Sequence, residues 1–270
     1  MTRWIRKRSL SALIVPLALA AIFSAGCDIV TADLRSEETS TWHKTYTLDA
    51  NGRVEIGNVN GKIIVEASAG NTVDVTATKK ARGATPEAAK AALERATIAE
   101  DVNSGRVKID TKVARMEGIV FNGGNLQVEY RVKVPAGAEV RFVTTNGGIE
   151  VSDLTGRVYA ETTNGGVTAR NIGGQIDAST TNGGLDIDMS RVPDGGVKLE
   201  CTNGGIRLRL PKDAKANINA SITNGGIDTG DLSIDGSGEN NRRRLDGKLN
   251  GGGPRIQIEG MNGGIKLSSR

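Results

Sequence analysis

The side chains suited to catalysis are few in this sequence and lie far apart. The single histidine is His43, and the only cysteines are Cys27 and Cys201. A catalytic nucleophile needs an activating base within hydrogen-bond reach, and no such constellation is present. The spacings of zinc sites and nucleotide-binding loops do not occur either, because the glycine-rich segments precede expected strands rather than helices. We therefore expect no catalytic residue, no metal and no cofactor.

Carboxylates at outward positions are the remaining candidates for chemistry. Glycoside hydrolases use a pair of carboxyl groups across the bond they cleave. Here Glu150, Asp186 and Asp228 occupy equivalent positions of a repeated pattern, but Thr168 and Arg207 interrupt that row.

A second outward row mixes Asp188 with Arg170 and Arg209. Alternating signs of this kind reduce like-charge repulsion between neighbouring strands. The aspartates do not recur at every turn, as they would in a calcium-binding repeat. We interpret both rows as surface charge and expect a protein without enzymatic activity. A polysaccharide-active enzyme stays as an alternative, because β-helices can carry that chemistry.

These side chains are spaced by a repeated tripeptide, Asn-Gly-Gly, that organises most of the chain. It begins at Asn122, Asn146, Asn164, Asn182, Asn203, Asn224, Asn250 and Asn262. From Asn146 to Asn224 the successive steps are 18, 18, 21 and 21 residues. Repeats of this length are typical of solenoids, whose coils bury their apolar sides by stacking on one another.

Apolar and polar residues alternate on both sides of the triplet, which predicts one strand before it and one after it. The inward positions before it are Val140, Val158, Ile176, Val197 and Ile218, then Phe142, Ala160, Ala178, Leu199 and Ala220, then Thr144, Thr162, Thr180, Cys201 and Ile222. The inward positions after it are Ile149, Val167, Leu185, Ile206 and Ile227, then Val151, Ala169, Ile187, Leu208 and Thr229. Burial of Cys201 would make its thiol unreactive.

The sequence therefore predicts an all-β fold, a single β-solenoid similar to a parallel β-helix, with coils of 18–21 residues across residues 42–270. Thr85-Pro86-Glu87 predicts the start of one short helix at about residues 86–98, because Thr caps helices and Pro suits their first position. We expect this helix to cover an end or a flank, where strand edges would otherwise be open.

The triplet itself suits a tight corner, because Asn and Gly tolerate positive φ. Stacked asparagines can also hydrogen bond to one another, as they do in cross-β ladders. The predicted structural turn ladder consists of Asn146, Asn164, Asn182, Asn203, Asn224 and Asn262. An alternative is that the glycine amides line an anion-binding groove.

Residues 1–26 have the layout of a lipoprotein signal peptide. A basic start at residues 3–8 precedes an apolar run at residues 10–23, and Ser24-Ala25-Gly26 leads to Cys27. These small residues resemble a lipobox, although Ser24 replaces the usual leucine, and the resemblance implies acylation of Cys27 and membrane anchoring. An ordinary secretory signal is the alternative. Residues 27–41 would form the lipidated cysteine and a tether, and Asp28 resembles an inner-membrane retention signal of enteric bacteria.

The electrostatic balance changes when this segment is removed. It carries four basic and no acidic side chains, so the 35 basic residues of the whole chain fall to the number of its acidic ones, 31. A neutral chain with 3% aromatic residues lacks the features of a nucleic-acid-binding protein. We interpret Arg242-Arg243-Arg244 as a solvated loop and expect no nucleic-acid partner.

Several motifs together resemble a known bacterial family. They are the turn at Val59-Asn60-Gly61, the Ala/Glu-rich helix, the step Val134-Pro135-Ala136-Gly137, the Asn-Gly-Gly coils and the closing Gly251-Gly252-Gly253-Pro254 element. The family is the "putative adhesins", β-strand-repeat envelope proteins with a domain of unknown function, and the resemblance covers about Trp42 to Arg270.

The resemblance implies a binding, adhesin-like or scaffold role in the bacterial cell envelope, facing the periplasm or the cell surface. An envelope protein or glycan would be the partner. Some family members are associated with envelope-stress systems, so a stress sensor or regulator acting through a membrane partner is an alternative. The family supplies no catalytic residues.

Overall fold

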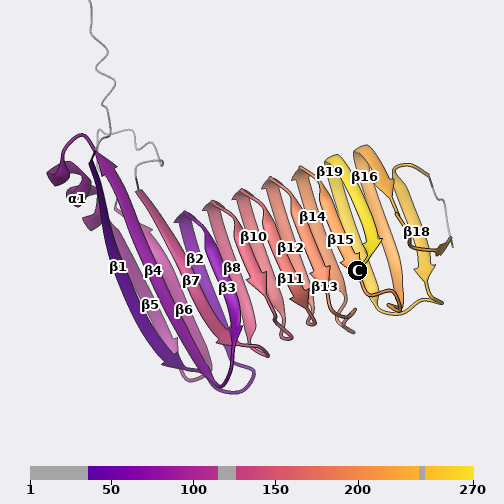
Figure 1. Ribbon diagram of the computed structural model, residues 1–270, viewed down its shortest axis with the longest axis horizontal. Coiled ribbons are helices and arrows are strands. Elements are labelled where there is room, and N and C mark those ends of the chain that lie inside the picture. Colours follow the sequence, from indigo (N-terminus) through magenta and orange to yellow (C-terminus); the bar gives the residue numbers. More distant parts are fainter. Residues whose placement is uncertain (1–35, 115–125, 237–240) are drawn as a thin grey trace, which may run out of the picture. The chain divides into compact units, whose positions relative to one another are not determined.

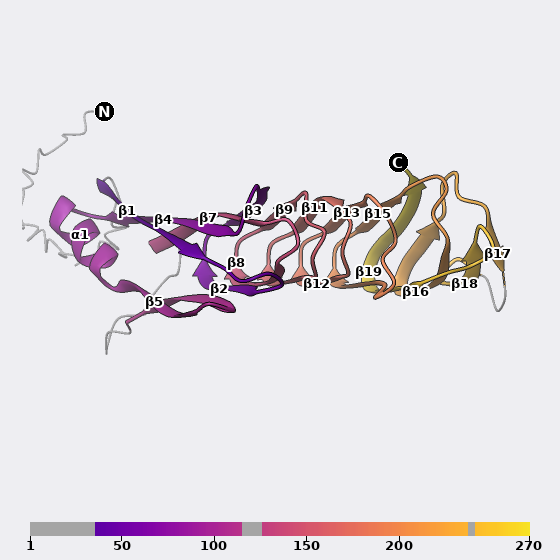
Figure 2. The same ribbon diagram turned by 90° about the horizontal axis from the view of Figure 1, so that it is seen from below.

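Two layers of strands enclose one apolar core in the computed structural model, which describes residues 36–114, 126–236 and 241–270. Residues 33–270 form one compact unit. Each repeat adds one strand to each layer, and the Asn-Gly-Gly corner joins the two (Figures 1 and 2). The predicted all-β solenoid-like fold is confirmed, and neighbouring repeats pair in parallel.

The central coils stack in chain order. Their strands are β8 (Glu139–Asn146), β9 (Ile149–Ser152), β10 (Val158–Asn164), β11 (Val167–Ile172), β12 (Ile176–Asn182), β13 (Leu185–Met189), β14 (Val197–Asn203) and β15 (Ile206–Leu210). The even-numbered strands pair with one another in layer 1, and the odd-numbered ones pair in layer 2.

The C-terminal coils depart from chain order. Their strands are β16 (Ala216–Asp228), β17 (Ile234–Gly236), β18 (Arg244–Leu249) and β19 (Arg255–Ser269). The last strand, β19, pairs with β14 and β15 on one side and with β16 on the other. The coil of Asn262 therefore lies between those of Asn203 and Asn224, which the sequence pattern had made neighbours. β18 and β17 then continue layer 1 in antiparallel pairing beyond β16.

The N-terminal part comprises β1 (Ser36–Thr47), β2 (Arg53–Asn60), β3 (Ile63–Ser68), β4 (Thr72–Gly83), α1 (Pro86–Glu94), β5 (Ala96–Asn103), β6 (Arg106–Val113) and β7 (Leu126–Pro135). β2 and β3 form a coil that stacks directly on β8 and β9. β1, β4 and β7 extend layer 2, and β6 and β5 extend layer 1.

Two predicted boundaries differ from the structure. The helix begins as expected, with Thr85 as its N-cap, but it ends at Glu94 rather than near residue 98. The reason is that Ala96 starts β5 and pairs with Val113, so strand pairing overrides the helix propensity of this alanine-rich segment. The tether predicted for residues 27–41 is also too long, because Ser36 already pairs with Gly83 in β1.

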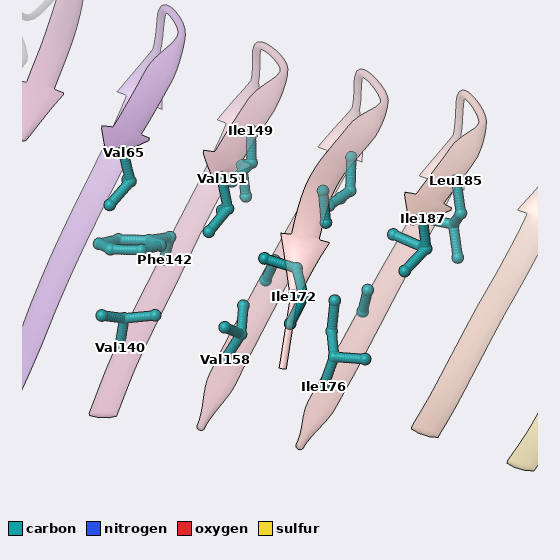
Figure 3. Close-up of a cluster of buried hydrophobic side chains, with 14 of the residues drawn as sticks. Val65, Val140, Phe142, Ile149, Val151, Val158, Ile172, Ile176, Leu185 and Ile187 are labelled. Atoms are coloured by element: carbon teal, nitrogen blue, oxygen red, sulfur yellow. The ribbon is translucent and has the colours of Figure 1, made fainter. Parts of the chain in front are cut away.

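The core contains the predicted inward side chains. All those assigned before the triplet in the five repeats are at most 5% exposed. Figure 3 shows Phe142, Val158, Ile176 and their neighbours between the strands. After the triplet, only Ile227 and Thr229 are incompletely buried. Ile227 lies in β16 and Thr229 directly follows it. β16 is the last strand of layer 2, so no further coil covers these two residues.

Replacement of Ile176 by Asp should disrupt the whole stack, because an unpaired carboxylate would enter a position that is 1% exposed. We expect the free energy of unfolding to fall by about 4 kcal/mol or more, measured by urea denaturation.

The matched control is Gln257→Asp, which adds the same carboxylate at an outward position beside Lys198. It loses the hydrogen bond from Gln257 to Glu259 but keeps its carboxylate outward, so it should cost only about 1 kcal/mol. Equal, small effects of the two substitutions would contradict the inward assignment of Ile176.

Candidate functional site

The corners of seven coils are joined by a continuous row of asparagine side chains. Each Nδ2 donates to the Oδ1 of the next asparagine toward the N-terminal coil. The bonds run from Asn146 to Asn60 (2.6 Å), Asn164 to Asn146 (2.8 Å), Asn182 to Asn164 (2.9 Å), Asn203 to Asn182 (3.0 Å), Asn262 to Asn203 (2.8 Å) and Asn224 to Asn262 (2.8 Å). The structure thus places all six sequence-derived asparagines in one row and adds Asn60.

The triplet at Asn250 does not belong to this row. Asn250 lies in the turn before β19, and its Nδ2 donates to the carbonyl groups of Lys212 and Ala214. Asn122 lies outside the described residues. The tripeptide alone therefore does not identify a coil corner.

The first glycine of each triplet in this row allows the coils to approach closely. Gly183 has φ +151°, and a Cβ there would overlap the carbonyl oxygen of Gly165. That oxygen instead accepts a hydrogen bond from the buried hydroxyl of Thr180 (2.7 Å). In the next coil the Cys201 thiol takes the same role and donates to Gly183 (3.3 Å). Burial raises the pKa of Cys201, so this thiol is a structural donor rather than a nucleophile.

The amide groups of the first glycines are used within the stack. The N–H groups of Gly147, Gly165 and Gly183 each donate to the asparagine carbonyl of the next coil, at 2.8–2.9 Å. They cannot form the anion-binding row that the sequence allowed as an alternative. In contrast, no acceptor for the N–H of Gly184 or Gly205, second glycines of their triplets, lies in the described part of the chain.

A surface groove runs beside the corners of the C-terminal coils, with a volume of about 500 Å³. The second glycines of four triplets lie along it, at Gly184, Gly205, Gly264 and Gly226. Since these residues have no side chain, they leave a depression in the outer face of layer 2. Four charged side chains complete the lining, namely Asp186, Arg207, Lys266 and Asp228.

Asp186 is held between two arginines at one side of this groove. Its carboxylate lies 2.7 Å from Arg170 and 2.7 Å from Arg209. The hydrogen bond from Arg170 and the positive charges of Arg170 and Arg209 keep the pKa of Asp186 below its usual range. Asp188 is the direct strand partner of Arg209, as expected, and its carboxylate lies 3.3 Å from Arg270.

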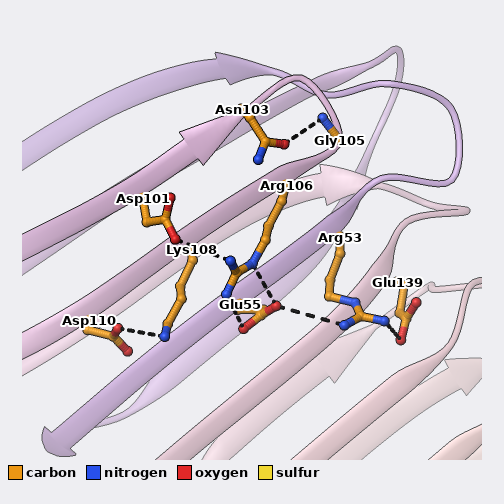
Figure 4. Close-up of polar contacts among 9 residues, drawn as sticks. All are labelled: Arg53, Glu55, Asp101, Asn103, Gly105, Arg106, Lys108, Asp110 and Glu139. Atoms are coloured by element: carbon orange, nitrogen blue, oxygen red, sulfur yellow. Dashed lines mark hydrogen bonds and ion pairs between the residues drawn. The ribbon is translucent and has the colours of Figure 1, made fainter.

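Layer 1 carries a separate ion-pair network at its N-terminal coils (Figure 4). Glu55 lies 3.0 Å from Arg106, which also contacts Asp101 at 3.2 Å. Arg53 links Glu55 to Glu139. The hydrogen bond from Arg106 lowers the pKa of Glu55. Every charge in this network has a partner of opposite sign, so it stabilises the strand order and leaves no free group for chemistry.

The remaining sequence candidates do not form a reactive centre. His43 is exposed and lies 3.0 Å from Asp74. Among the described residues, no group of three or more His, Cys, Asp or Glu side chains could hold a metal ion. Cys27 lies outside the described residues. No helix in the described ranges is both long and apolar enough to span a membrane.

Comparison with known proteins identifies the family. The profile of the family described as "Toastrack DUF4097" matches residues 33–268. The chain belongs to this family. Its two-layered stack of coils is therefore a Toastrack domain, whose function is unknown. None of the curated proteins matches the sequence.

Solved structures match this chain at low sequence identity. A "putative cell adhesion protein" from Clostridium sporogenes is 11% identical with a TM-score of 0.52, and the match covers 86% of this chain and 100% of that one. A "putative adhesin" from Bacteroides fragilis is 10% identical with a TM-score of 0.36, covering 86% and 97%. The first likeness supports the fold alone.

The sequence reasoning recognised Arg207 but did not connect it with Lys266. These two residues are direct partners on the adjacent strands β15 and β19, although they lie 59 residues apart in the sequence. The pairing depends on the insertion of β19, so no spacing in the sequence could reveal it.

The row of asparagines predicts different costs for Asn262 and Asn224. Asn262 both donates and accepts within the row, whereas Asn224 only donates. With each hydrogen bond contributing about 1 kcal/mol, Asn262→Ala should reduce the free energy of unfolding by about 1 kcal/mol more than Asn224→Ala does. Equal costs in urea denaturation, or a larger cost for Asn224→Ala, would count against the coil order.

The ion pairs of Asp186 predict a pH-dependent contribution to stability. Because its folded pKa is lowered, the contribution is present above the unfolded pKa of about 3.9 and is lost as pH falls through the folded value. Asp186→Asn should therefore lower the urea midpoint at pH 7, and the difference from the wild type should vanish at strongly acidic pH. Asp194→Asn, at an exposed position, is the control. A deficit in Asp186→Asn that is constant across pH would contradict the ion-pair account.

Proposed function

We propose that this protein is a lipid-anchored, non-catalytic binding protein of the bacterial cell envelope, with an adhesin-like or scaffold role. The observation that carries the proposal is the outer surface of the stack. It is a long array of regularly spaced side chains beside a groove, on strands fixed by main-chain pairing. Rigid β-scaffolds that present repeated side chains are suited to binding extended partners.

The carboxylates of the groove argue against a hydrolase. A general acid needs a raised pKa to hold its proton near neutral pH, whereas that of Asp186 is lowered by its arginines. Asp228 lies three strands away, since β15 and β19 separate its strand from β13. Asp186 therefore lacks the raised pKa that a general acid requires, and the second carboxylate of the groove does not lie beside it.

The proposed anchor is Cys27, preceded by a lipoprotein-type signal in residues 1–26. Acylation there would hold the domain at a membrane surface through more than one acyl chain. Asp28 favours retention at the inner membrane if the host follows the enteric rule. The domain of residues 33–270 would then face the periplasm or the cell surface and present its outer layers to an envelope protein or glycan.

Anchoring is tested by replacing Cys27 with Ser. The wild-type protein should fractionate with membranes and incorporate an alkyne-labelled fatty acid, and Cys27→Ser should do neither. Recovery of the Cys27→Ser protein in membranes, with unlabelled wild type, would overturn the lipid anchor.

Binding is tested by crosslinking in the native cells, with recovery of the anchored protein and mass spectrometry of protein and glycan adducts. We expect one envelope component to be enriched over an unrelated lipoprotein of similar abundance. A reproducible hydrolase or lyase activity of the purified protein, lost on substitution of Asp186 or Asp228, would contradict the non-catalytic assignment.

A further inference from the structure

The groove on the outer face of layer 2 combines an open floor with positive charge. Its floor follows the second glycines, where outward positions carry no side chain. Added methyl groups at Gly205 and Gly264 would meet nothing closer than 3.6 Å and 3.8 Å. The space above these residues is therefore empty because of residue type rather than because of tight packing.

Two cations stand over this floor without strong partners. Arg207 is exposed and, although it is the strand partner of Asp186, it forms no ion pair within the described chain, because that carboxylate is bonded to Arg170 and Arg209. Lys266 reaches Asp228 only at 3.9 Å, and both side chains are more than half exposed. An exposed pair at this distance contributes little to stability. Structural pairing therefore does not account for the two cations.

The nearby carboxylate does not cancel this charge. Asp186 is already bonded to Arg170 and Arg209, so that group of three side chains carries a net positive charge. The charged lining itself is balanced, with Arg207 and Lys266 against Asp186 and Asp228. The positive excess comes from Arg170 and Arg209 at the border, where Arg270 offsets Asp188. Such a surface attracts anions at a distance.

The spacing of the cations suits a polymer. Arg207 and Lys266 are direct partners on adjacent parallel strands, so their Cα atoms are about 4.8 Å apart along the stack. The guanidinium group can bind a carboxylate with two parallel hydrogen bonds. The N–H groups of Gly184 and Gly205, which have no acceptor in the described chain, add donors on the floor.

The lining also selects among polyanions. Single-stranded nucleic acids are held by aromatic side chains that stack on the bases, and none of the residues along the groove is aromatic. A narrow polymer that carries repeated carboxylates could bind through the cations and the open floor alone, without aromatic stacking.

We propose that this groove binds the carboxylate groups of an acidic glycan, with Arg207 and Lys266 as the principal contacts. The inference rests on the proposed binding function and specifies its ligand class. The glycan would lie along the stack over Gly184, Gly205 and Gly264, and successive carboxylates would meet cations from successive coils.

The test measures binding of oligogalacturonate to the purified full-length protein in detergent micelles, by isothermal titration calorimetry. Arg207→Gln combined with Lys266→Gln should weaken binding about tenfold or more, since charge-assisted contacts to carboxylates are lost. The matched control combines Arg131→Gln with Lys133→Gln. It removes the same charges from outward positions of β7 in the same layer, away from the groove, and should change the affinity by less than about twofold.

A second pair of substitutions tests the floor without changing the charge. Gly205→Ala with Gly264→Ala leaves the backbone unstrained but raises the floor, and should weaken binding while the thermal unfolding temperature stays close to that of the wild type. A neutral oligosaccharide of similar length should not bind.

Equal loss of affinity in the groove and control variants would overturn the groove assignment, because it would indicate non-specific attraction to positive charge. Failure of the wild type to bind any acidic oligosaccharide would overturn the ligand class. Neither result decides the proposed function itself, which the crosslinking in cells tests separately.

Discussion

The structure depends on the close stacking of identical corners. Each coil must place its Gly backbone directly over the carbonyl group of the previous one, and only a residue without Cβ fits there, as at Gly183. This approach brings the asparagine amides within 3.0 Å of each other along the row. It also sets the parallel register of the strands on both sides of the corner.

That register determines both the core and the surface. Fixing one corner on another aligns inward side chains such as Ile176 and Val197, and it aligns outward side chains in the same way. Rows of like charge would repel each other, so the outer rows alternate in sign or pair diagonally, as Asp186 does with Arg170 and Arg209. Where the alternation leaves two cations adjacent, at Arg207 and Lys266, the surface gains capacity to bind an anion.

Local sequence patterns predicted the buried positions and the helix start, whereas pairing between distant strands determined the order of the coils. Alternation identified buried positions such as Ile176, and Thr85-Pro86 identified the helix start. The place of β19 could not be predicted from the sequence. Ile256 and Ile258 alternate with polar residues just as Ile218 and Ala220 do, so the core would be filled equally well with β19 before β16 or after it.

The start of β1 and the cationic part of the groove could not be predicted from the sequence either. β1 is an edge strand whose first six residues include no buried side chain, so residues 36–41 show no apolar period. The juxtaposition of Arg207 and Lys266 follows from the place of β19 and could be recognised only with it.

The whole stack depends on the order of the coils, with β19 between β15 and β16. It is tested most directly by nuclear magnetic resonance scalar coupling across backbone hydrogen bonds. The N–H of Gly204 donates to the carbonyl of Asn262 at 2.9 Å, so the account predicts a coupling between the Gly204 nitrogen and the Asn262 carbonyl carbon. A coupling from Gly204 to the carbonyl carbon of Asn224 would contradict it, because the coils would then stack in chain order.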